Sequence, residues 1–379
     1  SGYFNFIRNN FKFDKEKNKL MKKKILISTG GSGGHVIPAQ IFFDHLKGQF
    51  QIFLTSDMRG KKFLNLNNYS LTIIDTPQIT KNLFLLPIKF LLLLYALIKS
   101  IFYLKIKKID ILISTGGYMS LPLCVAAKFL GKKIFLFEPN LVLGRANKFF
   151  LPICKKIFCY SHKIINFPEK YKKKIQLINP LLRKNFYSFS KYNHNKIIED
   201  KVNLLIIGGS QGAKLFDTKL KISIISLSKK YNIKIFQQTN FSNYKKLKDF
   251  YTKNKIENEL FDFKPDIQNT ISKANICVTR AGASTLSELI FLNIPSLAIP
   301  YTFAKDNHQY ENALFYKNKN CCWMLKEEEL INDNLTSSLV NIIENKDEYL
   351  NKKKNMQKFS YQNTWININE KLINTINEN

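Results

Sequence analysis

Residues 278–313 read VTRAGASTLSELIFLNIPSLAIPYTFAKDNHQYENA, and this stretch decides the fold. It predicts a strand at 276–279, then a small-residue loop and a helix that begins near Thr285. A second apolar strand at 296–299 leads into the polar segment 305–309. Loops that leave neighbouring parallel strands form the ligand site of open α/β sheets. A helix N-terminus beside amide and hydroxyl-binding side chains suits a ligand with an anionic end and a polyhydroxyl end.

Three glycine loops elsewhere follow apolar strands in the same way. They read STGGSGGH (28–35), STGGYMS (114–120) and IIGGSQGA (206–213). Glycine lets backbone N–H groups approach an anion closely at the start of a helix. No dinucleotide fingerprint is complete, because Val36 stands at the third glycine position, and no Walker loop is complete. The alternative for the first loop is a tight strand–helix turn without a ligand.

The strand-and-loop pattern starts twice, so the sequence predicts two domains. Further strands are expected at 51–55, 72–75, 134–137, 157–160 and 234–238. Two Rossmann-like, doubly wound halves that face each other across a cleft describe the GT-B architecture, an α/β fold.

The expected boundaries follow from composition. We assign 21–183 to an N-terminal acceptor- and membrane-binding domain, 184–200 to a linker and 201–379 to a C-terminal donor domain. We expect the last helix, which carries Trp365, to pack back on the N-terminal domain. Residues 1–20 are polar and charged, and we interpret them as a disordered leader or tag.

Composition excludes several classes of protein. The chain has 379 residues, 45% of them hydrophobic and 23% charged, which is typical of a folded protein. Its net charge of +31 comes from lysines spread along the whole chain, without a nucleic-acid-binding module, so we expect no nucleic-acid partner. The six cysteines show no metal-ligand spacing and indicate buried thiols in a reducing compartment.

The most apolar segment is 83–106, LFLLPIKFLLLLYALIKSIFYLKI. Pro87, Lys89 and Lys99 interrupt it, whereas a membrane-spanning helix needs about 20 apolar residues. We favour an interfacial helix, apolar on one face and rimmed with lysines. A buried core helix and a true transmembrane span are the alternatives.

Five segments in the expected order resemble glycosyltransferase family 28, and within it the MurG family. They are STGGSGGHVIPA (28–39), STGGYMSLP (114–122), EPNLVLGRANK (138–148), IIGGSQGAKLFD (206–217) and the opening stretch. The resemblance implies the GT-B fold. It also implies inverting transfer of GlcNAc from UDP-GlcNAc to the MurNAc C4 hydroxyl of lipid I, which yields lipid II for peptidoglycan.

The resemblance further implies a donor site, made by Asn140, Arg183, Ser210, Gln211, Ala283, Ser284, Thr285, Glu288 and Gln309. Within it, 283–285 would hold the diphosphate at a helix N-terminus, and Glu288 would accept hydrogen bonds from the ribose hydroxyls. Because 285–288 also matches a capping box, a capping role for Glu288 stays open. Arg280 is either structural or directed at the anion.

The acceptor's pyrophosphate would lie on the N-terminal glycine loops, at Ser32, Gly33, Gly34, Gly116, Gly117 and Tyr118. His35 is the candidate base for the acceptor hydroxyl, because imidazole accepts a proton near neutral pH. The alternative is that His35 caps its loop. Helix N-termini and backbone donors would stabilise the departing UDP. With no Asp-x-Asp motif, we expect neither a metal nor a cofactor.

The implied partners are UDP-GlcNAc, lipid I, anionic phospholipid and other cell-wall synthesis proteins. The implied location is peripheral, on the cytoplasmic face of the bacterial plasma membrane. Pro139 and His308 replace glutamines usual in the family, and the element that ends at Arg183 is one residue longer. Three rival functions stay open: a GT-B enzyme with another lipid acceptor such as diacylglycerol, a nucleotide-binding oxidoreductase and a non-catalytic membrane scaffold.

Overall fold

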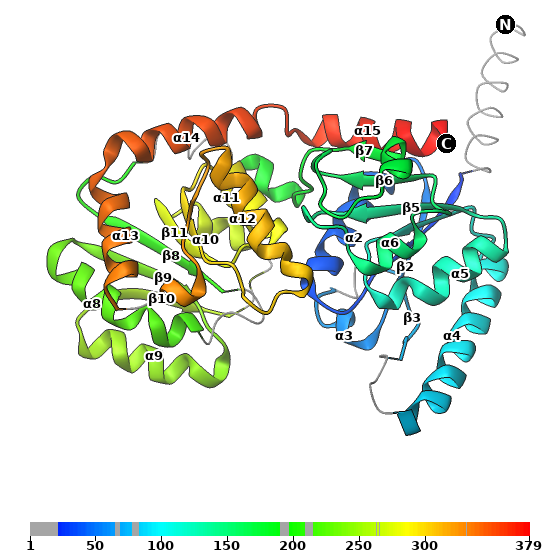
Figure 1. Cartoon of the computed structure of the whole chain (residues 1–379), viewed down its shortest axis with the longest axis horizontal. Helices are drawn as coiled ribbons and strands as arrows, with labels where there is room; N and C mark the ends of the chain where they lie inside the picture. Colours follow the sequence, from blue (N-terminus) through cyan, green and yellow to red (C-terminus); the bar gives the residue numbers. More distant parts are fainter. Residues whose placement is uncertain are drawn as a thin grey trace, which may run out of the picture.

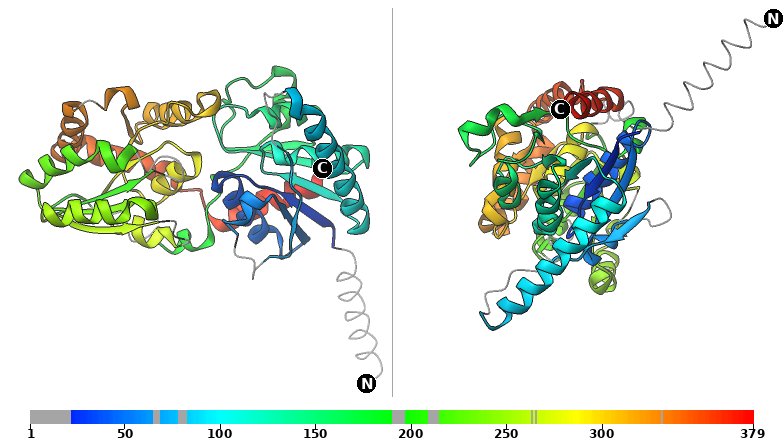
Figure 2. Two further views of the ribbon diagram at one scale, coloured as in Figure 1. Left: turned by 90° about the horizontal axis from the view of Figure 1, so that it is seen from below. Right: turned by 90° about the vertical axis from the view of Figure 1, so that its right-hand side faces the viewer.

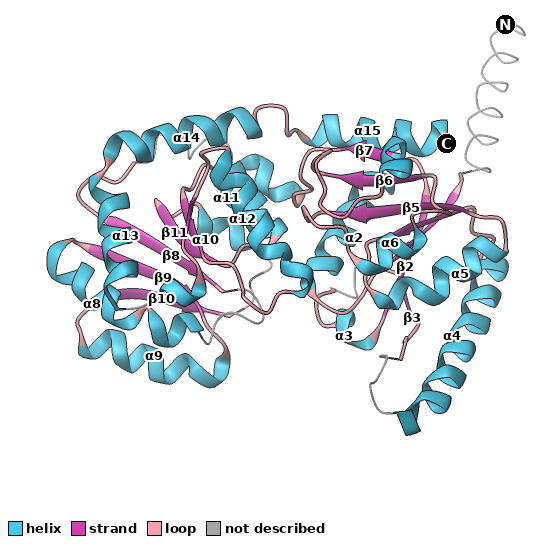
Figure 3. Ribbon diagram, in the orientation of Figure 1, coloured by secondary structure: helices cyan, strands magenta, loops and turns pink. Residues whose placement is uncertain are grey.

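The computed structural model describes residues 22–64, 69–77, 83–189, 197–208, 215–262, 264, 266–330 and 332–379. Within this part of the chain, two parallel sheets form two domains that lie side by side (Figure 1), each sheet flanked by helices (Figure 3). The predicted GT-B arrangement of two Rossmann-like halves is confirmed.

The N-terminal sheet has the strand order β3-β2-β1-β4-β5-β6-β7. Its strands are β1 (Lys24–Ser28), β2 (Gln51–Ser56), β3 (Leu71–Ile73), β4 (Ile111–Ser114), β5 (Lys133–Glu138), β6 (Lys156–Cys159) and β7 (Ile175–Leu177). Its helices are α2 (Gly33–Leu46), α3 (Met58–Lys61), α4 (Leu86–Ile106), α5 (Leu121–Phe129) and α6 (Arg145–Phe150). Apolar clusters cover both faces of this sheet, which explains strands such as β4 that are apolar at every position but the last.

The C-terminal sheet has the order β10-β9-β8-β11-β12-β13. Its strands are β8 (Val202–Ile207), β9 (Ile233–Gln238), β10 (Glu257–Phe261), β11 (Ile276–Thr279), β12 (Ser296–Ala298) and β13 (Trp323–Met324). Its helices are α8 (Lys221–Lys230), α9 (Phe241–Lys253), α10 (Ile267–Ile271), α11 (Ala283–Phe291), α12 (His308–Asn318), α13 (Asn332–Glu344) and α14 (Lys346–Ser360).

Strand order reverses direction between β1 and β4 in one sheet and between β8 and β11 in the other. In open α/β sheets the ligand crevice lies at such a reversal, outside the carboxyl ends of the strands. Among the described residues, the loops after β1, β4 and β11 are at these positions, and the sequence singled them out. Topology therefore places these loops at the expected ligand crevice.

The last helix, α15 (Trp365–Glu378), belongs to the N-terminal domain in space. Ile368, Leu372 and Ile376 join the cluster that contains β1 and α2, and Figure 2 shows the chain ending on that domain from two directions. The connection into α15 is fixed by Asn363 Nδ2, which donates to Pro180 O at 3.0 Å. The chain thus crosses between the domains near 180 and again near 363.

The structure corrects several details of the predicted elements. Helix α11 starts at Ala283, two residues earlier than expected, and strands β7, β10 and β13 were not predicted. The predicted Gly209 loop and residues 1–20 lie outside the described residues.

The interpretation of 83–106 as a buried core helix is wrong. Of the 21 residues of α4, only Ala96, Ser100 and Leu104 are buried. Phe90 and Leu91 are 65% and 63% exposed, and Figure 1 shows α4 on the outer edge of the N-terminal domain. By length and composition α4 can cross a membrane, with a mean hydropathy of 1.7 over its most apolar window. The interfacial and spanning interpretations therefore both stay open.

Candidate active site

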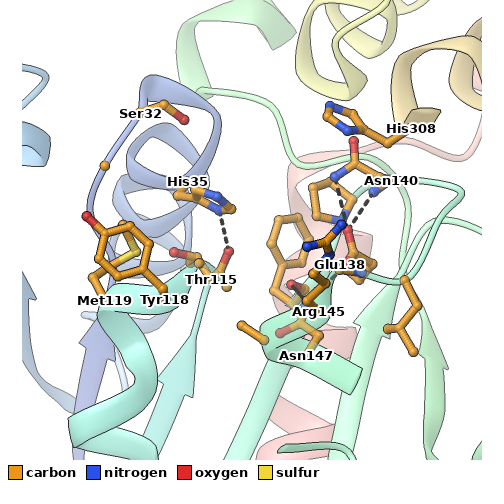
Figure 4. Close-up of a pocket in the computed structure, with 18 of the residues that line it drawn as sticks. Ser32, His35, Thr115, Tyr118, Met119, Glu138, Asn140, Arg145, Asn147 and His308 are labelled. Carbon is orange, nitrogen blue, oxygen red and sulfur yellow. Dashed lines mark hydrogen bonds between the residues drawn. The ribbon is translucent and has the colours of Figure 1, made fainter. Parts of the chain in front are cut away.

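A cavity of about 840 Å³ lies where the two domains meet (Figure 4). The loops after β1, β4 and β5 line it from the N-terminal domain. Asp306 and His308, at the start of α12, line it from the C-terminal domain. Among the predicted acceptor residues, Ser32, Gly116, Gly117 and Tyr118 border this cavity, together with His35 and Asn140.

His35 is the third residue of α2 and faces the cavity (Figure 4). Its Nδ1 lies 2.8 Å from Thr115 O. A carbonyl oxygen only accepts, so Nδ1 carries the hydrogen and Nε2 keeps its lone pair. Burial lowers the pKa of His35 from its usual 6.5, partly opposed by this bond to Thr115. The ring is therefore neutral at neutral pH. It contacts the neighbouring β4 loop, not its own loop as the capping alternative required.

The β4 loop needs glycine at two positions. Gly116 and Gly117 have φ values of 90° and 84°, in the region that side chains disfavour. A Cβ on Gly117 would also lie 2.4 Å from Met119 Sδ and 3.5 Å from His35 Nε2. The pair thus lets the loop turn directly beneath the imidazole.

The first glycine loop is arranged differently from the prediction. Gly31 N, expected to be available to an anion, donates to Asp57 Oδ1 at 2.8 Å. Asp57 Oδ2 also accepts from Arg59 Nη2 at 2.8 Å, and the same guanidinium contacts the Tyr118 hydroxyl. Gly33 and Gly34 form the first turn of α2 and are not among the residues that line the cavity.

Sequence reasoning missed Glu138, which organises the third wall. Its side chain is almost fully buried at the end of β5. Its Oε1 accepts from Asn140 Nδ2 at 3.0 Å, and its Oε2 accepts from Gly144 N at 2.8 Å and Asn147 Nδ2 at 2.9 Å. The available sequence signal was a carboxylate at the end of an otherwise apolar strand.

The other residues missed by sequence reasoning join the two domains. Arg145 Nη2 donates to Asp306 Oδ1 at 2.8 Å, across the mouth of the cavity. Asn312 on α12 donates to Asn140 Oδ1 at 3.1 Å. Neither pair has a sequence signal, because the partners are more than 150 positions apart.

The donor residues at α11 lie away from this cavity. Ala283, Ser284 and Thr285 form the first turn of α11, with Gly282 as the N-cap. Since the helix starts before Thr285, the predicted capping box of residues 285–288 is absent. Glu288 instead accepts from Arg183 Nη2 at 3.3 Å. Burial raises the pKa of Glu288, an effect that the Arg183 charge opposes.

Arg280 is structural. It is 6% exposed, and its Nη1 donates to Glu327 Oε2 at 2.8 Å and to the carbonyls of Ile299 and Pro300. These bonds join the loop after β11 to the end of β12.

The remaining predicted donor residues divide into two cases. Gln309, in the first turn of α12, accepts from Tyr301 N at 3.0 Å through Oε1 and so holds the loop before the helix. Ser210 and Gln211 lie outside the described residues.

Two family models match the chain. The glycosyltransferase family 28 N-terminal domain matches residues 25–159, and the family 28 C-terminal domain matches residues 203–364. The chain belongs to glycosyltransferase family 28.

Relatives of this family 28 chain carry one name. A Pelagibacter ubique protein is 55% identical over 95% of the chain and 100% of its own length. A Rickettsia felis protein is 34% identical over 85% of the chain and 91% of its own length. Both are named UDP-N-acetylglucosamine–N-acetylmuramyl-(pentapeptide) pyrophosphoryl-undecaprenol N-acetylglucosamine transferase.

A solved structure supports the fold. Acinetobacter baumannii MurG superposes with a TM-score of 0.75 at 20% identity, covering 95% of this family 28 chain and 100% of that protein. Within the described residues all six cysteines are buried and unpaired, as predicted. No group of three His, Cys, Asp or Glu side chains there is placed to hold a metal ion.

Proposed function

We propose that this chain transfers GlcNAc from UDP-GlcNAc to the MurNAc C4 hydroxyl of undecaprenyl-pyrophosphoryl-MurNAc-pentapeptide, which converts lipid I to lipid II. The observation that carries this function is the 55% identity, over 95% of the chain, to a relative named for that transfer. The matches to both family 28 domains support a chain that contains two substrate-binding halves.

For the donor, we propose that the diphosphate binds the N-terminus of α11 at residues 283–285, where three consecutive N–H groups and the helix dipole favour an anion. Glu288 would accept from the ribose hydroxyls after its bond to Arg183 is exchanged, which would free Arg183 for the diphosphate. Asn140 and Gln309 would contact the sugar. Ser210 and Gln211 are kept as donor residues from the family motif alone.

For the acceptor, we propose the cavity beside His35. Ser32, Gly116, Gly117 and Tyr118, which line the cavity, would surround its pyrophosphate. Gly33 and Gly34, in the first turn of α2, are kept as acceptor residues from the family motif alone. Asp57 accepts from Gly31 N, so that N–H would not bind the pyrophosphate. The partly exposed Arg59 guanidinium on the same wall, although paired with Asp57, would add positive character there.

The reaction is a single inverting displacement. The MurNAc O4 forms a bond to C1 of GlcNAc while the bond from C1 to the UDP oxygen breaks with its electron pair. His35 Nε2 takes the O4 proton, because Nδ1 is already bonded to Thr115 O. The positive end of α11 stabilises the charge that develops on UDP.

We further propose that the N-terminal domain, residues 21–183, carries the acceptor and membrane contacts, and that residues 201–379 carry the donor. The exposed apolar face of α4 supports a peripheral position on the cytoplasmic face of the plasma membrane, on anionic phospholipid. There the enzyme would meet undecaprenyl carriers and other cell-wall synthesis proteins.

The deciding experiment incubates the purified chain with radiolabelled UDP-GlcNAc and one of two acceptors, a short-chain lipid I analogue or diacylglycerol. We expect label in the lipid product and release of one UDP per transfer. Label on diacylglycerol instead would overturn the choice of acceptor, and absence of transfer to both would overturn the function.

A further inference from the structure

A second cavity lies where the chain crosses between the two domains, and its volume is about 210 Å³. Tyr160 and Ile178 line it from the N-terminal domain, and residues of α11, α12 and α14 line it from the C-terminal domain. Pro180 and Asn363, at the two crossings, complete the wall. Among the described residues, none lines both this cavity and the one beside His35, so the two are separate.

The two crossings are tied to each other by side-chain amides. Asn179 Nδ2 donates to Gln362 O at 2.8 Å, and Asn363 Nδ2 donates to Pro180 O at 3.0 Å. The Tyr187 hydroxyl donates to Asn363 Oδ1 at 3.2 Å. Because the rest of the wall comes from both domains, the shape of the second cavity depends on how the domains lie about these crossings. A molecule that fills the cavity would contact both domains and hold their arrangement.

The lining of the second cavity suits a small neutral molecule with one ring. None of the described residues that line it is Asp, Glu, Lys, Arg or His, so a charged ligand would lose its hydration without gaining an ionic partner. The aromatic residues of the lining are Tyr160, Phe291, Phe315, Tyr316 and Phe359. An apolar cavity of roughly 150 Å³ holds benzene, so about 210 Å³ leaves room for a ring with a small substituent. Edge and offset contacts with the aromatic lining would stabilise such a ring.

Tyr160 adds a hydrogen-bond donor to this lining. Its hydroxyl oxygen accepts from Leu181 N at 2.9 Å. Burial raises the pKa of Tyr160, so the hydroxyl keeps its hydrogen at neutral pH. No acceptor within the described part of the chain takes this hydrogen. The substituent that fits best is therefore a hydrogen-bond acceptor such as a carbonyl oxygen.

Helix α11 connects the second cavity to the proposed donor site. Ser287 and Ile290 line the cavity. Glu288, next to Ser287, accepts from Arg183 Nη2 at 3.3 Å, and Arg183 closely follows the first crossing in the chain. Donor binding as proposed above requires Glu288 to exchange Arg183 for the ribose. A ligand that holds α11 against the first crossing would therefore favour the ion pair over the donor.

We propose that the second cavity is a regulatory site for a neutral single-ring molecule with a carbonyl acceptor, and that its occupant keeps Glu288 paired with Arg183 and so weakens the binding of UDP-GlcNAc. The binding site stands on the cavity alone, whereas the effect on the donor rests on the proposed function. Acetophenone has one ring, one carbonyl and no charge, and it is the probe. Benzoate, of similar size but charged, is the matched control ligand.

Binding is tested on the full wild-type chain by NMR of isotope-labelled isoleucine methyl groups. We expect acetophenone to shift the methyl signals of Ile178 and Ile290, which line the cavity from the two domains, with a Kd on the order of 1 mM. Benzoate should not shift them, because the cavity offers its carboxylate no cation. Unshifted signals at acetophenone concentrations well above this Kd, or equal binding of benzoate, would overturn the site.

A cavity-filling variant tests where acetophenone binds. Ser360→Phe places a ring in the cavity from the end of α14 and should abolish the shifts. Ser226→Phe, at an exposed position on α8 in the same domain, is the matched control and should bind acetophenone like the wild type. Acetophenone binding that persists in a folded Ser360→Phe protein would place the ligand elsewhere and contradict the assignment.

Calorimetry measures the effect on the donor. With the cavity saturated by acetophenone, we expect the Kd for UDP-GlcNAc to rise at least about fivefold, and UDP-GlcNAc should weaken acetophenone binding by the same factor, because coupling between two sites is reciprocal. An unchanged Kd for UDP-GlcNAc would overturn the regulatory role. The two proposals fail in different ways. A wild-type protein that does not transfer GlcNAc refutes the function, whereas an active wild type whose Ile178 and Ile290 signals ignore acetophenone refutes only the second site.

Discussion

His35 illustrates how one backbone contact can assign a chemical role to a residue. Thr115 O fixes the hydrogen on Nδ1, and burial lowers the pKa of the ring, so neutral His35 persists below pH 6.5. If His35 is the base, the acid limb of the kcat/KM profile lies below pH 6.5, because activity is lost only as the pH falls through the lowered pKa. His35→Ala should lower kcat about 10²- to 10⁴-fold and abolish this limb.

The control for His35 is His162→Ala, an exposed histidine in the same domain, which should leave the rate and the pH profile unchanged. An acid limb that survives in His35→Ala would assign the proton transfer to another group.

Glu288 is the residue on which the donor site depends. It is largely buried and paired with Arg183, and its carboxylate would form the contact to the ribose. A hydrogen bond to a charged group contributes about 1.5–3 kcal/mol. Glu288→Gln should therefore raise the KM for UDP-GlcNAc roughly 10- to 100-fold and leave the KM for the lipid acceptor unchanged, as measured by steady-state kinetics with each substrate varied. Equal effects on both substrates would point to a structural role. Glu370→Gln, an exposed glutamate on α15, is the control.

At the scale of elements, the sequence predicts best where local pattern and topology agree. β11 has the predicted bounds because three apolar residues and Thr279 end at a small-residue loop. β13 has only two residues, and β10, ENELF at the sheet edge, has three polar residues before its two apolar ones, so neither produces a run of apolar residues. The start of α11 was placed too late because Gly282, not a Ser or Thr side chain, is its N-cap. The alternative capping role that was left open for Glu288 is excluded for the same reason.

The candidate site was predictable in part. Glycine loops, His35 and Glu288 stand in recognisable local patterns, but Asn312, Asp306 and Arg145 reach the site only through the packing of two domains. Periodicity within one chain segment contains no information about such contacts. Arg280 shows the converse, since the sequence left a structural and an anion-facing role equally open and the structure shows an ion pair with Glu327.

Helix α4 provides a prediction for a whole element. Replacing Phe90 and Leu91, both mostly exposed, by Glu should weaken binding to phosphatidylglycerol vesicles at least about tenfold, because full burial of each apolar side chain contributes about 1.5–3 kcal/mol. Sedimentation with vesicles measures this. Phe241→Glu, on the exposed start of α9 in the other domain, is the control. Protein that stays with the membrane fraction of cells after an alkaline carbonate wash would favour a spanning helix over the interfacial one.

At the scale of the whole molecule, α15 ties the end of the C-terminal half to the N-terminal domain, and His45 lies in that contact. The His45 ring is 3% exposed and stacks on Trp365 with centroids 3.6 Å apart. Burial lowers the pKa of His45 to about 4, although Asn369 opposes the shift. The apolar contact between α2 and α15 thus disfavours protonation of His45.

The α2–α15 contact predicts how the stability of the protein depends on pH. The pKa of histidine in an unfolded chain is about 6.5, whereas that of folded His45 is about 4. Between these values the unfolded chain binds a proton at His45 and the folded chain does not. The free energy of unfolding therefore falls as the pH drops from about 6.5 toward 4. At pH 5 the loss from this residue is about 2 kcal/mol. His45→Phe keeps a ring against Trp365 but cannot titrate, so its thermal midpoint should fall less than that of the wild type over this range. His162→Phe, at an exposed position, should follow the wild-type curve. Parallel curves for His45→Phe and the wild type would show that the α2–α15 contact admits the proton without cost.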